Sequence, residues 1–511
     1  MSEFRISKQT EAEKDQYLLE CFHDAGFINE LLKSTSSIIS GRKGAGKTAL
    51  ARFLENKPLD YGLDYVCRLS VRNLDVSADT ERHERVNSIL FFILIQSIQK
   101  LLEKEQLSSE SKKFWGDFLI QNNLQAVSDY ETFIESKRTH TSGFSIKAKI
   151  AAWLMGSEGS VNGGESQEST RTVISNTPAA LVSALIQSLP ENKKFVFFID
   201  DISDYLDSSD DDQLSDDVNA IKDVLLNLET YNMQFLEANK NMRFVSLIRN
   251  DLFDFMVGSN VNKLRTDALE LEWNEKSFAS LIIRRLPFFA ENLEDHLRNP
   301  LEAIRSQFPD EVFSGIIEKF DTKHYALNFY SYMVAISFNR PRDFLKFCYA
   351  MRDRLSDKHP ATAENIDSAE GEYSDYFNKE LRDELFIASR MLKHELDQEE
   401  LNRLIDLLSQ ENGFSSGQLR SEFAKYLGVR TGVGHKKIEA FILELWRYGV
   451  IGVREERPSL IHFKYMSGFV LTIDKIKHSV FCLHRGLWWF SRKRQSKKMV
   501  KDYSQTPPNT P

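Results

Sequence analysis

The sequence is poor in cysteine and lacks a long apolar stretch. Its cysteines lie far apart and form no Cys-x-x-Cys pair; they are Cys21, Cys67, Cys348 and Cys482. This spacing argues against a disulfide framework or a zinc site and favours a reducing compartment. The longest apolar run, residues 89–95, is far shorter than the ~20 residues that cross a bilayer. The N-terminus is polar and mixed in charge, unlike a signal peptide. We therefore expect a soluble, cytoplasmic protein without a transmembrane segment.

A strong excess of positive charge is also missing. The 511 residues carry a net charge of −9, with 41% hydrophobic and 28% charged residues, which is ordinary for a soluble globular protein. A chain with this charge is not a general nucleic-acid binder, so any nucleic-acid contact requires a local basic patch. The length predicts about two to four domains.

The sequence does contain a phosphate-binding loop at residues 41–48, which read GRKGAGKT. The pattern G-x-x-x-x-G-K-T is that of P-loop nucleotidases. Its glycines let backbone N–H groups face a phosphate, Lys47 reaches the β- and γ-phosphates, and the Thr48 hydroxyl is a ligand for Mg²⁺. A short apolar strand before the loop and a helix after it disfavour the alternative, a glycine-rich turn that binds nothing. The residues predicted to contact the nucleotide are Gly41, Arg42, Lys43, Gly44, Ala45, Gly46, Lys47, Thr48 and Ala49.

A second motif closes an apolar run at residues 194–199, which ends in Asp200 and Asp201. A continuous apolar run is typical of a central parallel strand that is buried on both faces. The carboxyl end of such a strand lies at the edge of an α/β sheet where ligands bind. We predict that Asp200 holds Mg²⁺ and that Asp201 positions the attacking water. The alternative is a buried strand that ends in an acidic turn.

Further apolar strands are expected at residues 65–71, 243–249 and 268–273. With the two strands at the motifs they predict an α/β fold, a doubly wound parallel sheet. The expected strand order is 5-1-4-3-2, with the strands numbered along the chain.

Composition divides the rest of the chain. The predicted parts are a P-loop core at 1–276 with an inserted helical and flexible subdomain at 104–176, a helical lid at 277–360, a winged-helix-like domain at 380–470, a basic segment at 471–501 and a disordered tail at 502–511. Residues 355–380 are polar and read as a linker. Residues 204–217 are rich in aspartate and read as a solvated acidic loop, because the order of ligands in a calcium loop is absent.

Two C-terminal segments could touch nucleic acid. Helical patterns followed by a hairpin pattern at 399–465 have the winged-helix order, in which the third helix, 436–448, would read a DNA groove. That helix carries mixed charges, so a packing role is an equal alternative. Residues 478–501 lack acidic residues and could neutralise phosphates of nucleic acid or lipid head groups, or form a solubilising tail. Their basic residues are Arg485, Arg492, Lys493, Arg494, Lys497, Lys498 and Lys501.

The motifs GRKGAGKTAL, FVFFIDD, SLIRND, ELEW and NRPRDF together resemble bacterial P-loop ATPases of the additional-strand class. The relatives are the STAND and KAP-like NTPases and the AAA+ initiators of the origin-recognition type. The resemblance implies ATP and Mg²⁺, a nucleotide-driven switch, and assembly into a homo-oligomer or with a partner effector protein. Many such proteins act in anti-phage defence. The chain also lacks the N-K-x-D motif that reads guanine, so adenine is the default base.

The resemblance assigns roles to arginines as well. The strand at 243–249 would end in a γ-phosphate sensor, Arg249, with Asn250 in reserve; the alternative is an ion pair of Arg249 with a local acid. Arg342 of NRPRDF would contact the nucleotide from the lid, or would be a surface arginine.

Two further details concern an arginine supplied by a neighbouring subunit and the residue that positions the attacking water. Arg284 and Arg285 are candidates for an arginine that completes a neighbour's site. Asp201 stands where AAA+ proteins have a glutamate, which fits the STAND relatives better.

The leading hypothesis is an enzyme, a Mg²⁺-dependent ATPase that drives a switch or an assembly. The alternative is a nucleotide-gated adaptor or DNA-binding regulator with little turnover, which the short side chain of Asp201 and the winged-helix pattern favour. A kinase is set aside because no acceptor-site signature is present.

Overall fold

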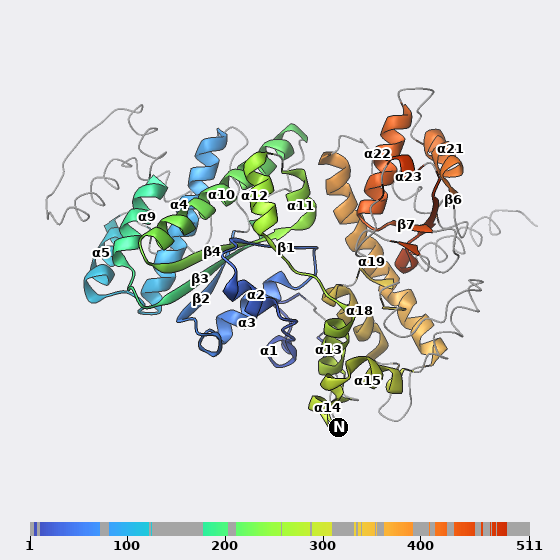
Figure 1. The fold of residues 1–511 in the computed structure, drawn as a ribbon, viewed down its shortest axis with the longest axis horizontal. Coiled ribbons are helices and arrows are strands. Elements are labelled where there is room, and N and C mark those ends of the chain that lie inside the picture. Colours follow the sequence, from blue (N-terminus) through green and yellow to red (C-terminus); the bar gives the residue numbers. More distant parts are fainter. Residues whose placement is uncertain are drawn as a thin grey trace, which may run out of the picture. The chain divides into compact units, whose positions relative to one another are not determined.

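The chain forms two compact units, described here from a computed structural model (Figure 1). One unit comprises residues 26–272, and the other comprises residues 1–25 together with 273–511. The expected P-loop core began at residue 1, whereas the first 25 residues belong to the second unit. The structure describes residues 5–7, 11–71, 81–121, 124, 177–202, 211–256, 258–286, 289–308, 332–333, 336–338, 340–352, 354, 362–391, 408, 414–426, 434–454, 461–462, 471, 473–476 and 478–487.

A five-stranded parallel sheet forms the centre of the first unit, so the expected α/β class is confirmed. The order of the strands across the sheet is β2-β3-β4-β1-β5. β4 therefore lies between the two strands that lead to the sequence motifs, β1 and β3. The strands are β1 (Ile38–Gly41), β2 (Tyr65–Ser70), β3 (Lys194–Asp200), β4 (Asn241–Arg249) and β5 (Leu269–Glu270).

Helices cover both faces of this sheet (Figure 1). α4 (Arg82–Glu103), α9 (Thr177–Ser188) and α10 (Asp211–Glu237) lie on one face, and α2 (Phe27–Lys33) and α3 (Lys47–Asn56) lie on the other. Burial on two sides explains why β3 is apolar from Phe195 to Ile199, since every residue from Phe195 to Asp200 is buried. The remaining helices of the unit are α5 (Ser109–Gln121), η1 (Leu59–Tyr61), α11 (Asn250–Phe255) and α12 (Ser259–Asp267).

The acidic loop expected at 204–217 is wrong over its second half, because α10 begins at Asp211. Acidic residues in the first turns of a helix interact favourably with its dipole, which reconciles the composition with a helix. Asp217 is buried and forms an ion pair with Arg85 of α4, with 2.6 Å between the carboxylate and the guanidinium. The pair therefore joins the two longest helices on that face of the sheet.

α4 is the one helix in the described part of the chain that is long and apolar enough to cross a membrane. Of its most apolar window, 72% is buried inside the protein. This burial favours a core helix over a membrane span.

The second unit begins with helices. Residues 355–380, expected as a linker, are in part the 29-residue helix α19 (Ala363–Met391). Ile366, Ala369, Tyr373 and Phe377 are buried at helical spacing along it, so the linker prediction was wrong over residues 363–380, and residues 355–361 lie outside the described part of the chain. The other helices are α1 (Leu18–Cys21), α13 (Glu275–Arg285), α14 (Leu293–Arg298), α15 (Pro300–Gln307) and α18 (Pro341–Arg352).

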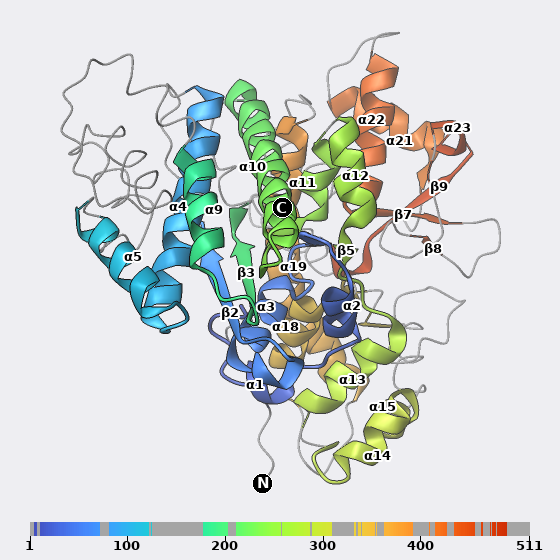
Figure 2. The same ribbon diagram turned by 60° about the vertical axis from the view of Figure 1, so that its left-hand side comes forward.

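A four-stranded antiparallel sheet completes the second unit, in the order β6-β9-β7-β8. Figure 2 shows β7, β8 and β9 beside α21 and α23. β7 (Ile451–Arg454) and β8 (Ile461–His462) pair as the expected hairpin strands would. No range was predicted for β6 (Phe414–Ser415) or β9 (Val480–Leu483). β9 lies inside residues 478–501, for which a contact with nucleic acid or lipid and a solubilising tail after a last packed strand were the alternatives. The elements beside the sheet are α21 (Ser416–Tyr426), α22 (Gly434–Arg447), α23 (Ile473–Ile476) and η4 (Arg485–Leu487).

The lid and the winged-helix-like domain were expected to be separate, but their buried side chains form one hydrophobic cluster. It includes Phe278 of α13, Phe377 of α19, Ile442 of α22 and Phe481 of β9. The helix expected at 399–409 lies outside the described residues except for Leu408, and the winged-helix assignment stays a prediction.

Candidate functional site

The phosphate-binding motif connects the end of β1 to the start of α3. Gly46 precedes the first helical residue with φ of 107°, a left-handed conformation that side chains rarely adopt. Gly41 is needed for a different reason, because a Cβ there would lie 3.3 Å from the Cβ of Leu271. The strand therefore turns into the helix through a left-handed residue that favours glycine at 46 and through a tight contact that favours glycine at 41.

The start of α3 is suited to an anion. The first N–H groups of a helix lack partners within the helix, and its dipole places partial positive charge there. Lys47 is buried, and its Nζ donates to the carbonyl oxygens of Gly41 at 2.7 Å and Arg42 at 3.0 Å. The ammonium group is thus held against the backbone of the loop, where a polyphosphate would meet both the charge and the N–H groups.

Asp200, the last residue of β3, lies against the start of the same helix. The Thr48 hydroxyl donates a hydrogen bond to its carboxylate. Asp200 is only 4% exposed. Burial raises the pKa of Asp200, as does the charge of Asp201, while the hydrogen bond from Thr48 and the charge of Arg68 oppose the shift. The two residues predicted as metal ligands are therefore brought together, and the carboxylate is one that a cation would stabilise.

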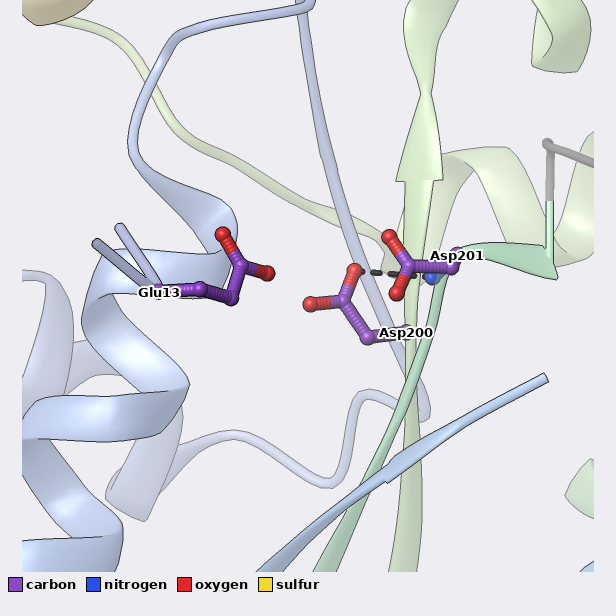
Figure 3. A group of neighbouring side chains, drawn as sticks. All are labelled: Glu13, Asp200 and Asp201. Atoms are coloured by element: carbon purple, nitrogen blue, oxygen red, sulfur yellow. Dashed lines mark hydrogen bonds between the residues drawn. The ribbon is translucent and has the colours of Figure 1, made fainter. Parts of the chain in front are cut away.

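Asp201 turns the chain out of the strand. Its φ of 61° is left-handed, an unusual and costly conformation for a residue other than glycine. Two hydrogen bonds hold it: its own N–H donates to Asp200 Oδ1 at 2.9 Å, and the Ser70 hydroxyl donates to its Oδ2 at 2.6 Å. Figure 3 shows the two carboxylates side by side at the end of β3. The side chain predicted to position water is thus fixed next to the predicted metal ligand.

Arg68 is a member of the site that the sequence did not reveal. Its Nη1 lies 3.2 Å from Asp200 Oδ2 and 3.8 Å from Asp201 Oδ2. β2 runs parallel to β3 with Ser70 opposite Asp200, and Arg68 shares a face of the strand with Ser70 because side chains alternate along a strand. A signal was present, since a charged residue interrupts the otherwise apolar stretch YVCRL.

These donors fit a magnesium ion. A threonine hydroxyl and two carboxylates are hard oxygen ligands of the kind that Mg²⁺ prefers, with the phosphate oxygens of a nucleotide as further ligands. The burial of the Asp200 carboxylate supports this fit, because a carboxylate that is charged in such a position needs a nearby cation.

Arg249, the predicted γ-phosphate sensor, is held in a local ion pair. Both carboxylate oxygens of Asp251 accept hydrogen bonds from it: Arg249 Nε donates to Oδ1 at 3.0 Å, and Nη2 donates to Oδ2. This is the alternative that the sequence left open. Arg249 does lie next to the loop, because it is opposite Gly41 in the β1–β4 pairing. The reserve residue, Asn250, hydrogen-bonds to Glu270.

The other predicted arginines belong to the second unit. Arg342 lies at the start of α18 with its guanidinium 3.9 Å from Glu380, and its side chain is 26% exposed. Arg340 of the same motif is buried and bonds to Asp343 at 2.6 Å and to Glu384 at 2.7 Å, a structural role.

Two residues, Arg284 and Arg285, were candidates for an arginine that completes a neighbour's site. Arg285 is buried and makes a two-armed ion pair with Asp15, at 2.7 Å and 3.1 Å. A guanidinium that is engaged in this way is not presented to another subunit, so Arg285 is excluded as the neighbour-directed arginine. Arg284 stays a candidate.

The basic segment begins inside the fold. Arg485 is buried, lies 3.5 Å from Glu370 and stacks over the ring of Tyr332 at 5.1 Å. Burial is the largest single influence and lowers the pKa of Arg485. Glu370 and Tyr332 act in the opposite direction, and the pKa is raised overall. The predicted contact of Arg485 with nucleic acid is therefore wrong, because its guanidinium is engaged in the core. The other six basic residues of 478–501 lie outside the described residues.

Three charged residues of the predicted groove-reading helix take part in ion pairs. Arg447 bonds to Glu444 at 2.9 Å on α22, and Glu439 of α22 bonds to Arg420 of α21 at 2.7 Å. These pairs favour the packing role for this helix.

Comparison with known proteins gives one partial match. A comparison with curated proteins finds none that matches the chain. Residues 292–382 match the family model of the FunZ-associated C-terminal helical domain, so that α14, α15, α18 and most of α19 are similar to that domain.

Proposed function

We propose that the protein is a Mg²⁺-dependent ATPase whose nucleotide site lies at residues 41–48. The observation that carries the proposal is the hydrogen bond from Thr48 to Asp200, which joins the phosphate-binding loop to the end of β3. The parallel sheet supports it, since its order places one strand between β1 and β3, as in the additional-strand ATPases that the sequence resembles.

Each residue has a defined task in this proposal. Lys47 and the N–H groups at the start of α3 hold the phosphates, and Thr48 and Asp200 would hold the metal. Bound Mg²⁺ would neutralise charge on the phosphate oxygens. Asp201 accepts a hydrogen bond from the attacking water and orients it. The Ser70 hydroxyl, at 2.6 Å, keeps the Asp201 carboxylate in place.

The test of the loop is ATP binding by Lys47→Ala. Calorimetry should show that the variant loses measurable affinity for Mg-ATP, because an ammonium group next to the β- and γ-phosphates is removed. Lys57→Ala is the matched control, since Lys57 follows the other end of α3 and packs over Phe53. Wild-type affinity in Lys47→Ala would reject the proposal.

A second candidate is a nucleotide-gated adaptor with little turnover. The observation that favours it is the restraint of Asp201, whose carboxylate bonds to Ser70 and lies 3.8 Å from Arg68. A carboxylate that is already engaged by two neighbouring side chains is less free to orient a water molecule. Steady-state phosphate release separates the two candidates. Turnover of roughly one per minute or faster, lost in Asp201→Ala while ATP binding is kept, supports the enzyme; slower release that Asp201→Ala leaves unchanged supports the adaptor.

The biological setting is part of the same proposal. The family resemblance favours a cytoplasmic, bacterial switch that acts as a homo-oligomer or with an effector protein, in anti-phage defence. The match of residues 292–382 to a FunZ-associated domain is the comparison that bears on this setting. Light scattering with and without Mg-ATP tests the assembly, and phage challenge of cells with Lys47→Ala tests the role in defence.

A further inference from the structure

The two carboxylates at the end of β3 have a cation beside them from the neighbouring strand. Arg68 Nη1 lies 3.2 Å from Asp200 Oδ2 and 3.8 Å from Asp201 Oδ2. The three side chains are only 18%, 6% and 11% exposed, so solvent screens them poorly. The contact is fixed by the fold, because β2 pairs with β3 along six consecutive residues.

In the absence of metal, Arg68 supplies positive charge to the two carboxylates of the site. Two adjacent carboxylates repel each other, and one of them is nearly inaccessible to water. A buried, unpaired charge is strongly destabilising. The guanidinium supplies one positive charge to the pair, as a metal ion would supply two.

We propose that Arg68 is the resident counter-cation of the metal site and that a divalent metal must compete with it for Asp200. This inference rests on the proposed function, since it assigns Asp200 to the metal. Arg68 is thus a positioning residue that keeps the site from holding a metal ion alone. The phosphates of ATP bring the negative charge that allows metal and Arg68 to be present together, so metal and nucleotide bind as a pair.

The test is Mn²⁺ binding to the protein without nucleotide, measured by calorimetry or by electron spin resonance. Arg68→Met should bind Mn²⁺ at least tenfold more tightly than the wild type, because the repulsion between a unit positive charge ~4 Å away and a divalent ion exceeds a factor of ten in affinity even with the screening of bulk water. Arg68→Lys keeps the charge and should stay near the wild type. Arg82→Met is the matched control, since it breaks the ion pair of Arg82 with Asp223 and leaves the site intact.

A second measurement separates this role from simple structural support. In chelator, Arg68→Met should unfold at a lower temperature than the wild type, and Mn²⁺ should restore most of the loss. Arg68→Gln, which keeps a hydrogen-bond donor without the charge, replaces the methionine variant if that variant does not fold. Equal losses of melting temperature with and without Mn²⁺ would show a purely structural residue.

The proposal is overturned if the neutral variants bind Mn²⁺ no more tightly than the wild type, including the case in which none of them binds it. Mg-ATP binding, measured for the same variants, distinguishes this failure from that of the proposed function. If ATP still binds and Lys47→Ala abolishes it, the nucleotide site stands and only the role of Arg68 is lost.

Discussion

The hydroxyl of Thr48 donates a hydrogen bond to the carboxylate of Asp200, although the two residues come from motifs far apart in the sequence. The contact forms because β1 and β3 are parallel strands of one sheet, so that the loop after β1 and the end of β3 meet at the same edge. It brings together the two side chains that the sequence assigned separately to a metal ion.

A first prediction removes that hydroxyl alone. Thr48→Val keeps the size of the side chain but loses a metal ligand and a donor to Asp200. The gain in ATP affinity on adding Mg²⁺ should fall by about tenfold or more, since second-sphere and ligand contacts to a metal are typically worth that much. Binding of ATP in chelator should change little. Thr48→Ser is the control and should behave as the wild type, and a full Mg²⁺ effect in Thr48→Val would contradict the metal assignment.

The second prediction concerns pH and the buried pair between α4 and α10. Burial raises the pKa of Asp217 to about 6, as does the charge of Asp216 to a smaller extent, although Arg85 acts against the shift. In an unfolded chain the pKa is about 4. Between these values the folded protein binds more protons than the unfolded chain, so stability falls as the pH rises from about 4 to about 6.

Asp217→Asn cannot titrate at this position and isolates the effect. The free energy of unfolding of the wild type, measured relative to this variant by urea titration, should decrease as the pH rises through that range. A difference that is constant between pH 4 and pH 6 would show that Asp217 stays charged beside Arg85.

The sequence predicted the parts of the molecule that depend on local patterns. The loop at 41–48 is a contiguous motif, and the apolar strand before Asp200 carries its own evidence of double burial. The polar stretch that became α19 also carried a signal, because Ile366, Tyr373, Phe377 and Leu381 recur at helical spacing. A reading by average composition concealed that periodicity.

Other features depend on register and cannot be read from one segment. The contact of Arg68 with Asp200 requires the alignment of β2 with β3, which is set by the packing of the whole sheet. β9 is only four residues long and stands before a run of basic residues, so the charge of the segment concealed the buried strand. The left-handed conformation of Asp201 likewise has no signature, since any residue but glycine is rare there.

The third prediction tests whether residues 478–487 belong to the packed unit. A Cβ at Gly486 would lie 2.6 Å from the carbonyl oxygen of Ile336 and 2.8 Å from the ring of Phe377. The Ser374 hydroxyl also donates to the carbonyl of Gly486 at 2.8 Å, and His484 stacks on Phe377. Gly486→Ala should therefore destabilise the protein by about 1–3 kcal/mol through overpacking, seen as a lower melting temperature.

Gly417→Ala in α21 of the same unit is the matched control. Nothing lies within 4 Å of the added Cβ, and Gly417 is exposed, so stability should change by only about 0.5 kcal/mol. Equal melting temperatures for Gly486→Ala and Gly417→Ala would show that η4 is not held against α19.

The last prediction concerns the basic residues that follow the packed strand. With Arg485 committed to the core, six remain at 488–501: Arg492, Lys493, Arg494, Lys497, Lys498 and Lys501. Such a local reversal of sign in a chain of net charge −9 is not needed for solubility. Aromatic residues precede them at 488–490 and could stack on unpaired bases, which favours single strands.

If this segment binds single strands, six neutralised phosphates give a log–log slope of affinity against salt of about −4. Removal of residues 491–511 should make that slope much shallower and leave Mg-ATP binding unchanged. The comparison is best made by fluorescence anisotropy with a labelled single strand and a duplex of the same length, for the full chain and the truncated one. The removed segment begins after the end of η4, so its removal leaves the contacts of Gly486 and Arg485 in place. A truncated chain with the affinity and salt slope of the full chain would mean that the segment is a solubilising tail and that any nucleic-acid contact lies elsewhere in the protein.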